Sequence, residues 1–175
     1  MSEPRLAELF LEVVPMHLFS LENRKAFAYS VGDLTVQAPV RRLRQFVHHR
    51  RTSRYDHALL VAYLSFVLAR KWNWDSRAAA RAGLLHDLFW QECDNSWSLC
   101  INHPEMAAEN AARLTYLSPK EENIILSHMW PAGRHLPRCR EAWLVDMMDN
   151  VVALLDYLGL SCRWNRQVEA ALLPC

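Results

Sequence analysis

Residues 56–88 decide the fold of this chain, and they read DHALLVAYLSFVLARKWNWDSRAAARAGLLHDL. In the first half of this stretch, apolar residues recur every three or four positions, as in a helix that buries one face. Asp75 or Ser76 then provides an N-cap for a second helix over residues 77–88, which is rich in alanine and leucine. The sequence therefore predicts two consecutive helices joined by a short turn.

The rest of the chain also favours helices. The whole chain has only four glycines, and the alternation typical of strands is absent except around residues 34–37. We expect further helices from His103-Pro104 to about residue 117, after a Ser118 capping box, and over residues 140–158, where an apolar pattern predicts burial on nearly all sides. Residues 7–19 form a weaker amphipathic candidate. The predicted fold class is all-α.

Length and composition limit the classes of protein. With 175 residues, 51% of them hydrophobic and a net charge of +1, the chain suits one globular domain. We expect a helical or extended segment over residues 1–48 and the main domain over 49–175. Every apolar run is interrupted by charge, the first residues lack the pattern of a secretory signal, and the five cysteines form no Cys-x-x-Cys pair. These features predict a cytoplasmic protein without membrane spans or a disulfide framework.

Histidine and aspartate mark the candidate site. An antiparallel helix pair brings the start of one helix beside the end of the next, so the predicted topology can join residues that are distant in sequence. Imidazole and carboxylate groups together suit divalent iron, manganese, cobalt, nickel or zinc, and the absence of cysteine disfavours a structural zinc site. A buried aspartate on an apolar helix also needs a partner. The candidates are His57, His86, Asp87, His103, His128, Asp146, Asp149 and Asp156.

The order of these motifs resembles the HD superfamily of metal-dependent phosphohydrolases. The matching text lies within residues 50–160 and comprises Arg54-Tyr55-Asp56-His57, Ala82-Gly83-Leu84-Leu85-His86-Asp87, His103-Pro104-Glu105, Ile125-Leu126-Ser127-His128 and Met147-Met148-Asp149-Asn150. The resemblance implies an HD-domain bundle of five or more helices. It implies that His57, His86, Asp87 and Asp149 are the primary metal ligands. His103 and His128 stand where relatives hold a second ion, with Asp87 bridging both, and a single-ion form stays open.

The resemblance also implies an activity. It implies hydrolysis of a small phosphoester, with a nucleotide favoured, by a metal-activated hydroxide that Asp87 holds, as in a phosphomonoesterase or phosphodiesterase. The chain departs from many relatives because no lysine follows the His-Asp pair, and it lacks the Gly-Tyr-Pro signature of cyclic-di-GMP phosphodiesterases. Substrate phosphate would then be bound by Arg54, Arg51, Arg134 or the metal ions themselves, with Arg54 and Arg134 as the chosen candidates. The alternative is a non-catalytic nucleotide-binding or regulatory HD module.

A basic segment precedes the first predicted helix. Residues 41–54 contain six arginines and two histidines but no acid. This segment is either a solvated surface or a local positive field that recruits an anion. The balanced total charge gives no reason to expect a nucleic acid or membrane partner. The resemblance implies a small phosphorylated substrate, and a homo-oligomer stays open.

Overall fold

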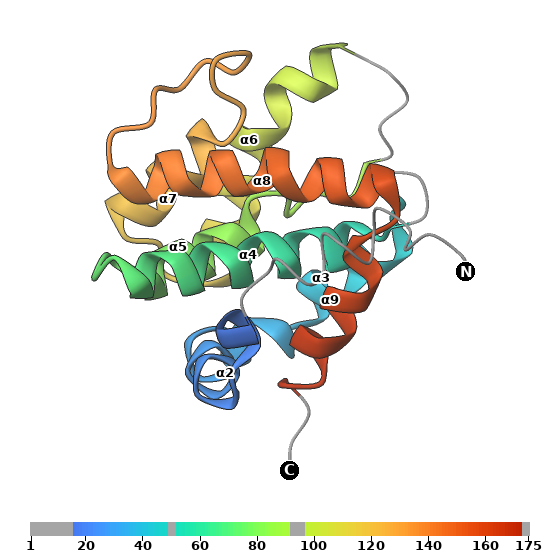
Figure 1. Cartoon of the computed structure of the whole chain (residues 1–175). Coiled ribbons are helices and arrows are strands. Elements are labelled where there is room, and N and C mark those ends of the chain that lie inside the picture. The colour runs from blue at the N-terminus through green and yellow to red at the C-terminus, as the bar shows by residue number, and fades with distance from the viewer. Residues whose placement is uncertain (1–15, 49–51, 92–96, 173–175) are drawn as a thin grey trace.

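The computed structural model describes residues 16–48, 52–91 and 97–172, and these residues form helices and connecting loops (Figure 1). Within these ranges the extended pairing is limited to one isolated bridge between Val47 and Ser53. The predicted all-α bundle of five or more helices is confirmed. The α-helices are α2 (Leu21–Thr35), α3 (Ala38–Arg42), α4 (Arg54–Lys71), α5 (Ser76–Leu85), α6 (Trp97–Leu114), α7 (Pro119–Ser127), α8 (Arg140–Leu158) and α9 (Ser161–Glu169), with short 3-10 helices at Met16–Phe19 and Leu43–Gln45.

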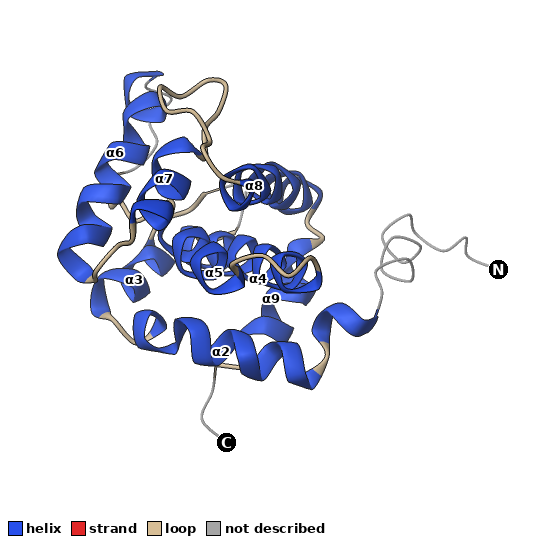
Figure 2. Cartoon of the chain, turned by 90° about the vertical axis from the view of Figure 1, so that its left-hand side faces the viewer, coloured by secondary structure: helices blue, strands red, loops and turns tan. Residues whose placement is uncertain are grey.

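Helix α4 is the centre of the bundle. Its side chains are buried on almost every side, and it packs against α5, α8 and α9 (Figures 1 and 2). Gly83 of α5 explains the close contact between α4 and α5. A Cβ atom on this residue would lie 3.0 Å from the Cα atom of Ala62, so a side chain here would force the helices apart. The predicted helix pair is therefore the core on which the other helices are assembled.

The helix ends follow the predicted capping chemistry. Asp75 caps α5 by accepting a hydrogen bond from the backbone N–H of Ala78. Ser118 and Glu121 form the expected capping box of α7. Gly159 ends α8 in the left-handed conformation, at φ 74°, which glycine adopts without steric cost. These local signals determine where the helices carrying the candidate site begin and end.

Two expectations about helices were wrong. Helix α6 begins at Trp97 rather than at His103, and Pro104 lies inside it. Proline favours the first turn but can also be accommodated inside a helix at the loss of one backbone hydrogen bond. The predicted burial of residues 140–158 on nearly all sides belongs instead to α4. Helix α8 lies in an outer layer of the bundle, and one of its faces is exposed although its composition is apolar.

The N-terminal part of the described chain joins the same core. Phe27, Val31 and Leu34 of α2 are fully or almost fully buried and belong to one cluster with the apolar residues of α4 and α5. Residues 34–37, the single candidate for a strand, form the end of α2 and the link to α3. The amphipathic candidate over residues 7–19 lies mostly outside the described residues. Within the described part of the chain, no helix has both the length and the apolar character required to cross a membrane.

Candidate metal centre

The six residues predicted as metal ligands lie together, although five different helices and helix ends supply them. His57 is in the first turn of α4, and His86 and Asp87 directly follow α5. His103 lies within α6, His128 ends α7 and Asp149 lies in the middle of α8. His57, His86, Asp87, His103 and His128 are all at most 9% exposed. The fold thus buries a cluster of imidazoles and carboxylates. Burying such groups costs free energy unless they are paired with a charge or a hydrogen-bond partner.

His57 lies between two aspartates of α8. Its Nε2 atom is 2.7 Å from Oδ1 of Asp149, and its Nδ1 atom is 2.7 Å from Oδ2 of Asp156. Burial alone would lower the pKa of His57, but the bonds to Asp149 and Asp156 outweigh it and raise the pKa to about 10. Without a metal ion, the His57 ring is therefore held as an imidazolium between two carboxylates.

One ring nitrogen of His86 has a hydrogen-bond partner, and the other has none among the described residues. Its Nδ1–H group donates to the backbone oxygen of Gly83 at 2.7 Å. Its Nε2 atom is buried and has no hydrogen-bond partner among the described residues. Oxygens of Asp149 and Asp87 lie 3.5 and 3.8 Å from Nε2, beyond a good hydrogen bond. Burial lowers the pKa of His86, but the charges of the two aspartates prevail and raise it.

His103 and His128 direct the same type of atom at each other. Their Nε2 atoms are 2.8 Å apart, and the Nδ1–H group of His128 donates to the backbone oxygen of Ile125 at 2.7 Å. Burial, together with the nearby charges of His86 and His103, lowers the pKa of His128 to about 3. A neutral His128 with its hydrogen on Nδ1 therefore presents the lone pair of Nε2 to the centre of the cluster.

Asp87 lies between the two sets of histidines. Its Oδ1 atom is 3.3 Å from Nε2 of His103 and 3.8 Å from Nε2 of His128. Its Oδ2 atom is 3.8 Å from Nε2 of His86 and 3.6 Å from Nε2 of His48. Burial raises the pKa of Asp87, but the surrounding histidines lower it well below its usual range. The carboxylate is thus ionised and has one oxygen directed to each side.

These atoms fit a divalent cation. Three overlapping groups of ligand atoms each lie within 4.8 Å of one another: His48, His57 and Asp87; His57, His86 and Asp149; and His86, Asp87 and His128. Within the described ranges, the buried Nε2 atom of His86 has no hydrogen-bond partner, and the Nε2 atoms of two other histidines point at each other. Histidine nitrogens whose other N–H is fixed by a backbone carbonyl are typical metal ligands, since this bond sets the tautomer and orients the ring.

The sequence matches the HD domain family over residues 54–154, which is more than half of the chain. The chain belongs to the HD domain family. The match includes the helices that carry the cluster and places the chain in a superfamily of metal-dependent phosphohydrolases. No curated protein and no solved structure matches the chain significantly.

His48 lies next to the predicted ligands of this HD domain, and the sequence did not single it out as a ligand. The Val47–Ser53 bridge and the bond from the backbone N–H of His48 to the oxygen of Thr52 fix its position. Its ring centre is 4.4 Å from that of His57. In the sequence, His48 was noted only as part of the basic segment 41–54. Its location before the first HD-domain helix gave no signal, because the contact depends on how this segment folds back.

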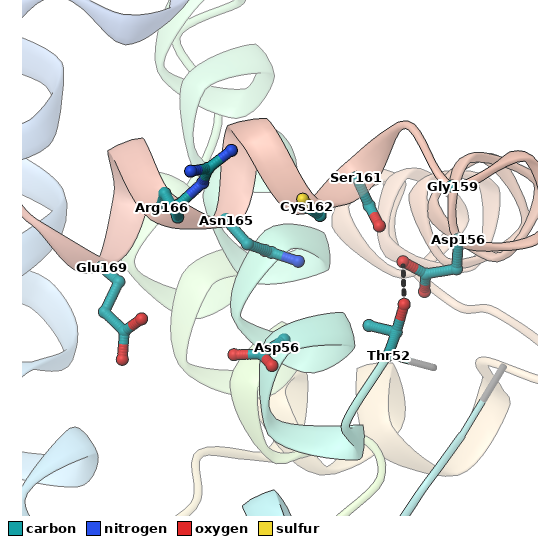
Figure 3. A pocket seen from close by; sticks show the side chains of 9 residues that line it. All are labelled: Thr52, Asp56, Asp156, Gly159, Ser161, Cys162, Asn165, Arg166 and Glu169. Atoms are coloured by element: carbon teal, nitrogen blue, oxygen red, sulfur yellow. Dashed lines mark hydrogen bonds between the residues drawn. The ribbon is translucent and has the colours of Figure 1, made fainter. Parts of the chain in front are cut away.

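Asp156 was a candidate from the sequence, without a role in the ligand set, and the structure places it beside His57. It is buried, and while Oδ2 binds His57, its Oδ1 atom accepts a hydrogen bond from the Thr52 hydroxyl at 3.1 Å (Figure 3). Asp156 also borders a cleft of about 910 Å³ between the start of α4 and α9, whose lining residues include none of the predicted ligands. Its position seven residues after Asp149, on the same helix face, was the available signal.

The two arginines predicted to bind substrate differ in position. Arg54 is fully buried, and its guanidinium donates to the backbone oxygens of Phe89 and Gln91 at 2.6 and 3.2 Å and lies over the Phe89 ring. This placement holds the loop after Asp87 and does not present Arg54 to a substrate. Arg134 is exposed in the loop between α7 and α8. Arg44, in the basic segment, pairs with Glu169 and lies 3.8 Å from Asp56, so nearby acids neutralise its charge.

Asp146 lies one turn before Asp149 but does not belong to the three groups of ligand atoms. It is 9% exposed, and its Oδ1 atom is buried without a hydrogen-bond partner among the described residues. Burial and the charge of Asp149 raise the pKa of Asp146 to about 7. Asp149, rather than Asp146, therefore faces the histidines.

Proposed function

We propose that this HD domain is a metal-dependent phosphohydrolase that cleaves a small phosphoester. The observation that carries the proposal is the position of Asp87, whose two oxygens face different sets of histidine Nε2 atoms at 3.3–3.8 Å. A structural cluster would be expected to neutralise its own charges and satisfy its own hydrogen bonds. This cluster leaves imidazole nitrogens directed at a common centre.

We assign the ligands as a binuclear set. His57, His86 and Asp149 would hold one divalent ion, His103 and His128 a second, and Asp87 would contact both. Iron, manganese, cobalt, nickel and zinc all suit this mixture of nitrogen and oxygen donors. When bound, such ions lower the pKa of a water ligand and stabilise the negative charge that develops on a phosphoryl group.

The residues of the chain have separate tasks in this proposal. Asp87, ionised and buried, accepts a hydrogen bond from the attacking water and orients it toward phosphorus. Asp156 accepts the Nδ1–H of His57 and so keeps its Nε2 directed at the ligand cluster. His48, which is partly exposed above Asp87, and Arg134, in the exposed loop after α7, are the candidates to contact phosphate oxygens. Arg54 has no part in this set.

The substrate class rests on the resemblance to the HD superfamily, which favours a nucleotide. Protonation of the leaving oxygen has no assigned donor. A cytoplasmic location likewise stays a prediction.

Metal analysis combined with a substrate panel tests the proposal. Protein purified without oxygen should contain one to two divalent ions per chain and hydrolyse at least one member of a panel of phosphomonoesters, phosphodiesters and dinucleotides. Asp87→Ala should lower kcat/KM by at least about 10³-fold, since its carboxylate contacts both ligand sets. Asp75→Asn is a matched control, because asparagine also caps helices and this position is remote from the cluster.

The possible outcomes distinguish the alternatives. Metal-loaded protein that binds nucleotides but hydrolyses no member of the panel would favour the non-catalytic module. Protein that binds no divalent ion at all would overturn the ligand assignment together with the activity.

A further inference from the structure

The outer face of α8 carries a continuous apolar stripe. Six large side chains on this face are between 40% and 65% exposed. The acidic residues of the same helix are buried or half-buried and therefore lie away from this face. In Figures 1 and 2, α8 lies at the outside of the bundle. The α8 stripe consists of Trp143, Met147, Val151, Leu154, Tyr157 and Leu158.

The stripe is large enough to be an interface. Each exposed portion contributes roughly 100 Å², given the size of aromatic and long aliphatic side chains, so the stripe covers about 600 Å². This area is at the upper limit of the largest apolar patch on a typical monomer. Two copies placed face to face would bury about 1,200 Å² in total, which reaches the range of specific protein interfaces.

The spacing within the stripe matches a helix-pair seam. Residues 143, 147, 150, 154 and 157 follow each other at intervals of four, three, four and three, the repeat of helices that pack side by side. The middle position of this series is Asn150, which is exposed and uses one amide N–H to bind the backbone oxygen of Asp146. The carboxamide retains an oxygen and a second N–H for a partner.

We propose that α8 pairs with α8 of a second copy of this chain, antiparallel and about a two-fold axis near Asn150. A two-fold interface brings the same patch of both subunits together, so a stripe that matches itself is suited to it. In the antiparallel pair, Trp143 of each copy lies beside Tyr157 of the other, and the two Asn150 carboxamides meet at the centre. A single central asparagine fixes the register of such a pair. The antiparallel arrangement also opposes the two helix dipoles favourably.

Sedimentation equilibrium of the full chain over about 1–100 µM tests the interface. The wild type should be a dimer in this range, and Leu154→Glu should shift the dissociation constant upward by at least about 100-fold, since it places two charges in the seam. Leu21→Glu is the matched control, because Leu21 on α2 and Leu154 are both 60% exposed. A monomeric wild type, or equal dimerisation of both variants, would overturn the proposal. Loss of association on deletion of residues 1–15, with Leu154→Glu unaffected, would assign the contact to that segment instead.

Cysteine cross-linking tests the orientation independently. With a short bismaleimide, Asn150→Cys should give a covalent dimer beyond the background of the native cysteines, whereas Trp143→Cys should not, because two copies of residue 143 lie at opposite ends of an antiparallel pair. Cross-linking of both variants would indicate a parallel pair and contradict the proposal. This inference does not depend on the proposed function, since the stripe includes none of the proposed ligands and Leu154→Glu should keep its metal content.

Discussion

Two polar clusters in this HD domain differ in how completely their side chains are paired by hydrogen bonds and ion pairs. In the first, Arg81 of α5 binds both oxygens of Asp33 at 2.7 and 2.9 Å, the backbone oxygen of Ser30 and the hydroxyl of Thr115, with Glu121 3.5 Å away. In the second, the candidate metal centre, one imidazole nitrogen has no partner among the described residues and two others lie 2.8 Å apart, at hydrogen-bond distance. Arg81 and Glu121 are as buried as the histidines of the second cluster, whereas the Asp33 side chain is 58% exposed.

The difference separates a structural role from a functional one. The Arg81 cluster joins α2, α5 and α7 with donors and acceptors that match, so removal of a member should cost folding energy. The candidate metal centre contains groups that compete for protons and leave one buried imidazole nitrogen without a partner among the described residues, so it should gain stability from an added cation. Each prediction below tests one side of this contrast.

The largest expected effect is on the Arg81 cluster. Arg81→Met leaves the buried Glu121 carboxylate without its cation and removes the bonds to Ser30, Thr115 and the exposed Asp33, so it should lower the free energy of unfolding by about 3–5 kcal/mol. Urea denaturation of the metal-free protein measures this change. Metal content per folded chain should stay at the wild-type level. Arg77→Met, an exposed position on the same helix, should change stability by less than about 0.5 kcal/mol.

Metal addition should act in the opposite direction on the other cluster. Manganese at about 100 times its dissociation constant should stabilise the native state by about 2.7 kcal/mol. For a domain of this size, this gain corresponds to a Tm increase of about 5–10 °C by scanning calorimetry. The shift should be preserved in Arg77→Met and be absent in His86→Ala. An equal shift in His86→Ala would place the bound ion elsewhere.

The sequence predicted those parts of the fold that depend on local chemistry. The helix pair around residues 56–88 follows from the spacing of its apolar residues. The Asp75 and Ser118 caps follow from side chains that bind the nearby backbone, and the end of α8 follows from the left-handed conformation that Gly159 adopts. It did not distinguish α4 from α8 as the central helix. Both are rich in apolar residues, and which of them is enclosed depends on long-range packing that composition does not encode.

Prediction of the candidate site from the sequence had the same limit, because contacts that depend on long-range packing were not predicted. The resemblance supplied six ligand residues, all of which the structure brings together. His48 was missed as a site residue, because its position depends on how the backbone before α4 folds back. Asp156 was a candidate whose contact with His57 was not predicted, because it depends on which side of α8 faces His57. The assignment of Arg54 to substrate failed for a related reason, since charge alone did not reveal that its guanidinium is buried against Phe89.

A smaller effect is expected when the hydrogen bond that orients the His57 ring is removed. Asp156→Ala removes the acceptor of its Nδ1–H group and should weaken manganese affinity by about 10–100-fold, as for other residues that orient a metal ligand. Isothermal titration calorimetry measures the affinity. Asp156→Asn retains an acceptor oxygen and should restore part of the loss. If the alanine variant bound metal as tightly as wild type, Asp156 would belong with the structural cluster.

The smallest effect concerns Asp146, which is buried near the candidate metal centre but is not one of the proposed ligands. Because the pKa of Asp146 is raised to about 7 in the native state, its ionisation costs stability, with no cost below about pH 3.8 and the full cost above pH 7. Asp146→Asn should therefore stabilise metal-free protein at pH 8 by about 1–2 kcal/mol and have little effect at pH 4. Urea denaturation in EDTA at both pH values measures this difference. A larger gain at pH 4 than at pH 8 would show that the Asp146 carboxyl has a partner that favours its charged form, and Asp146 would then belong with the self-sufficient Arg81 type of cluster.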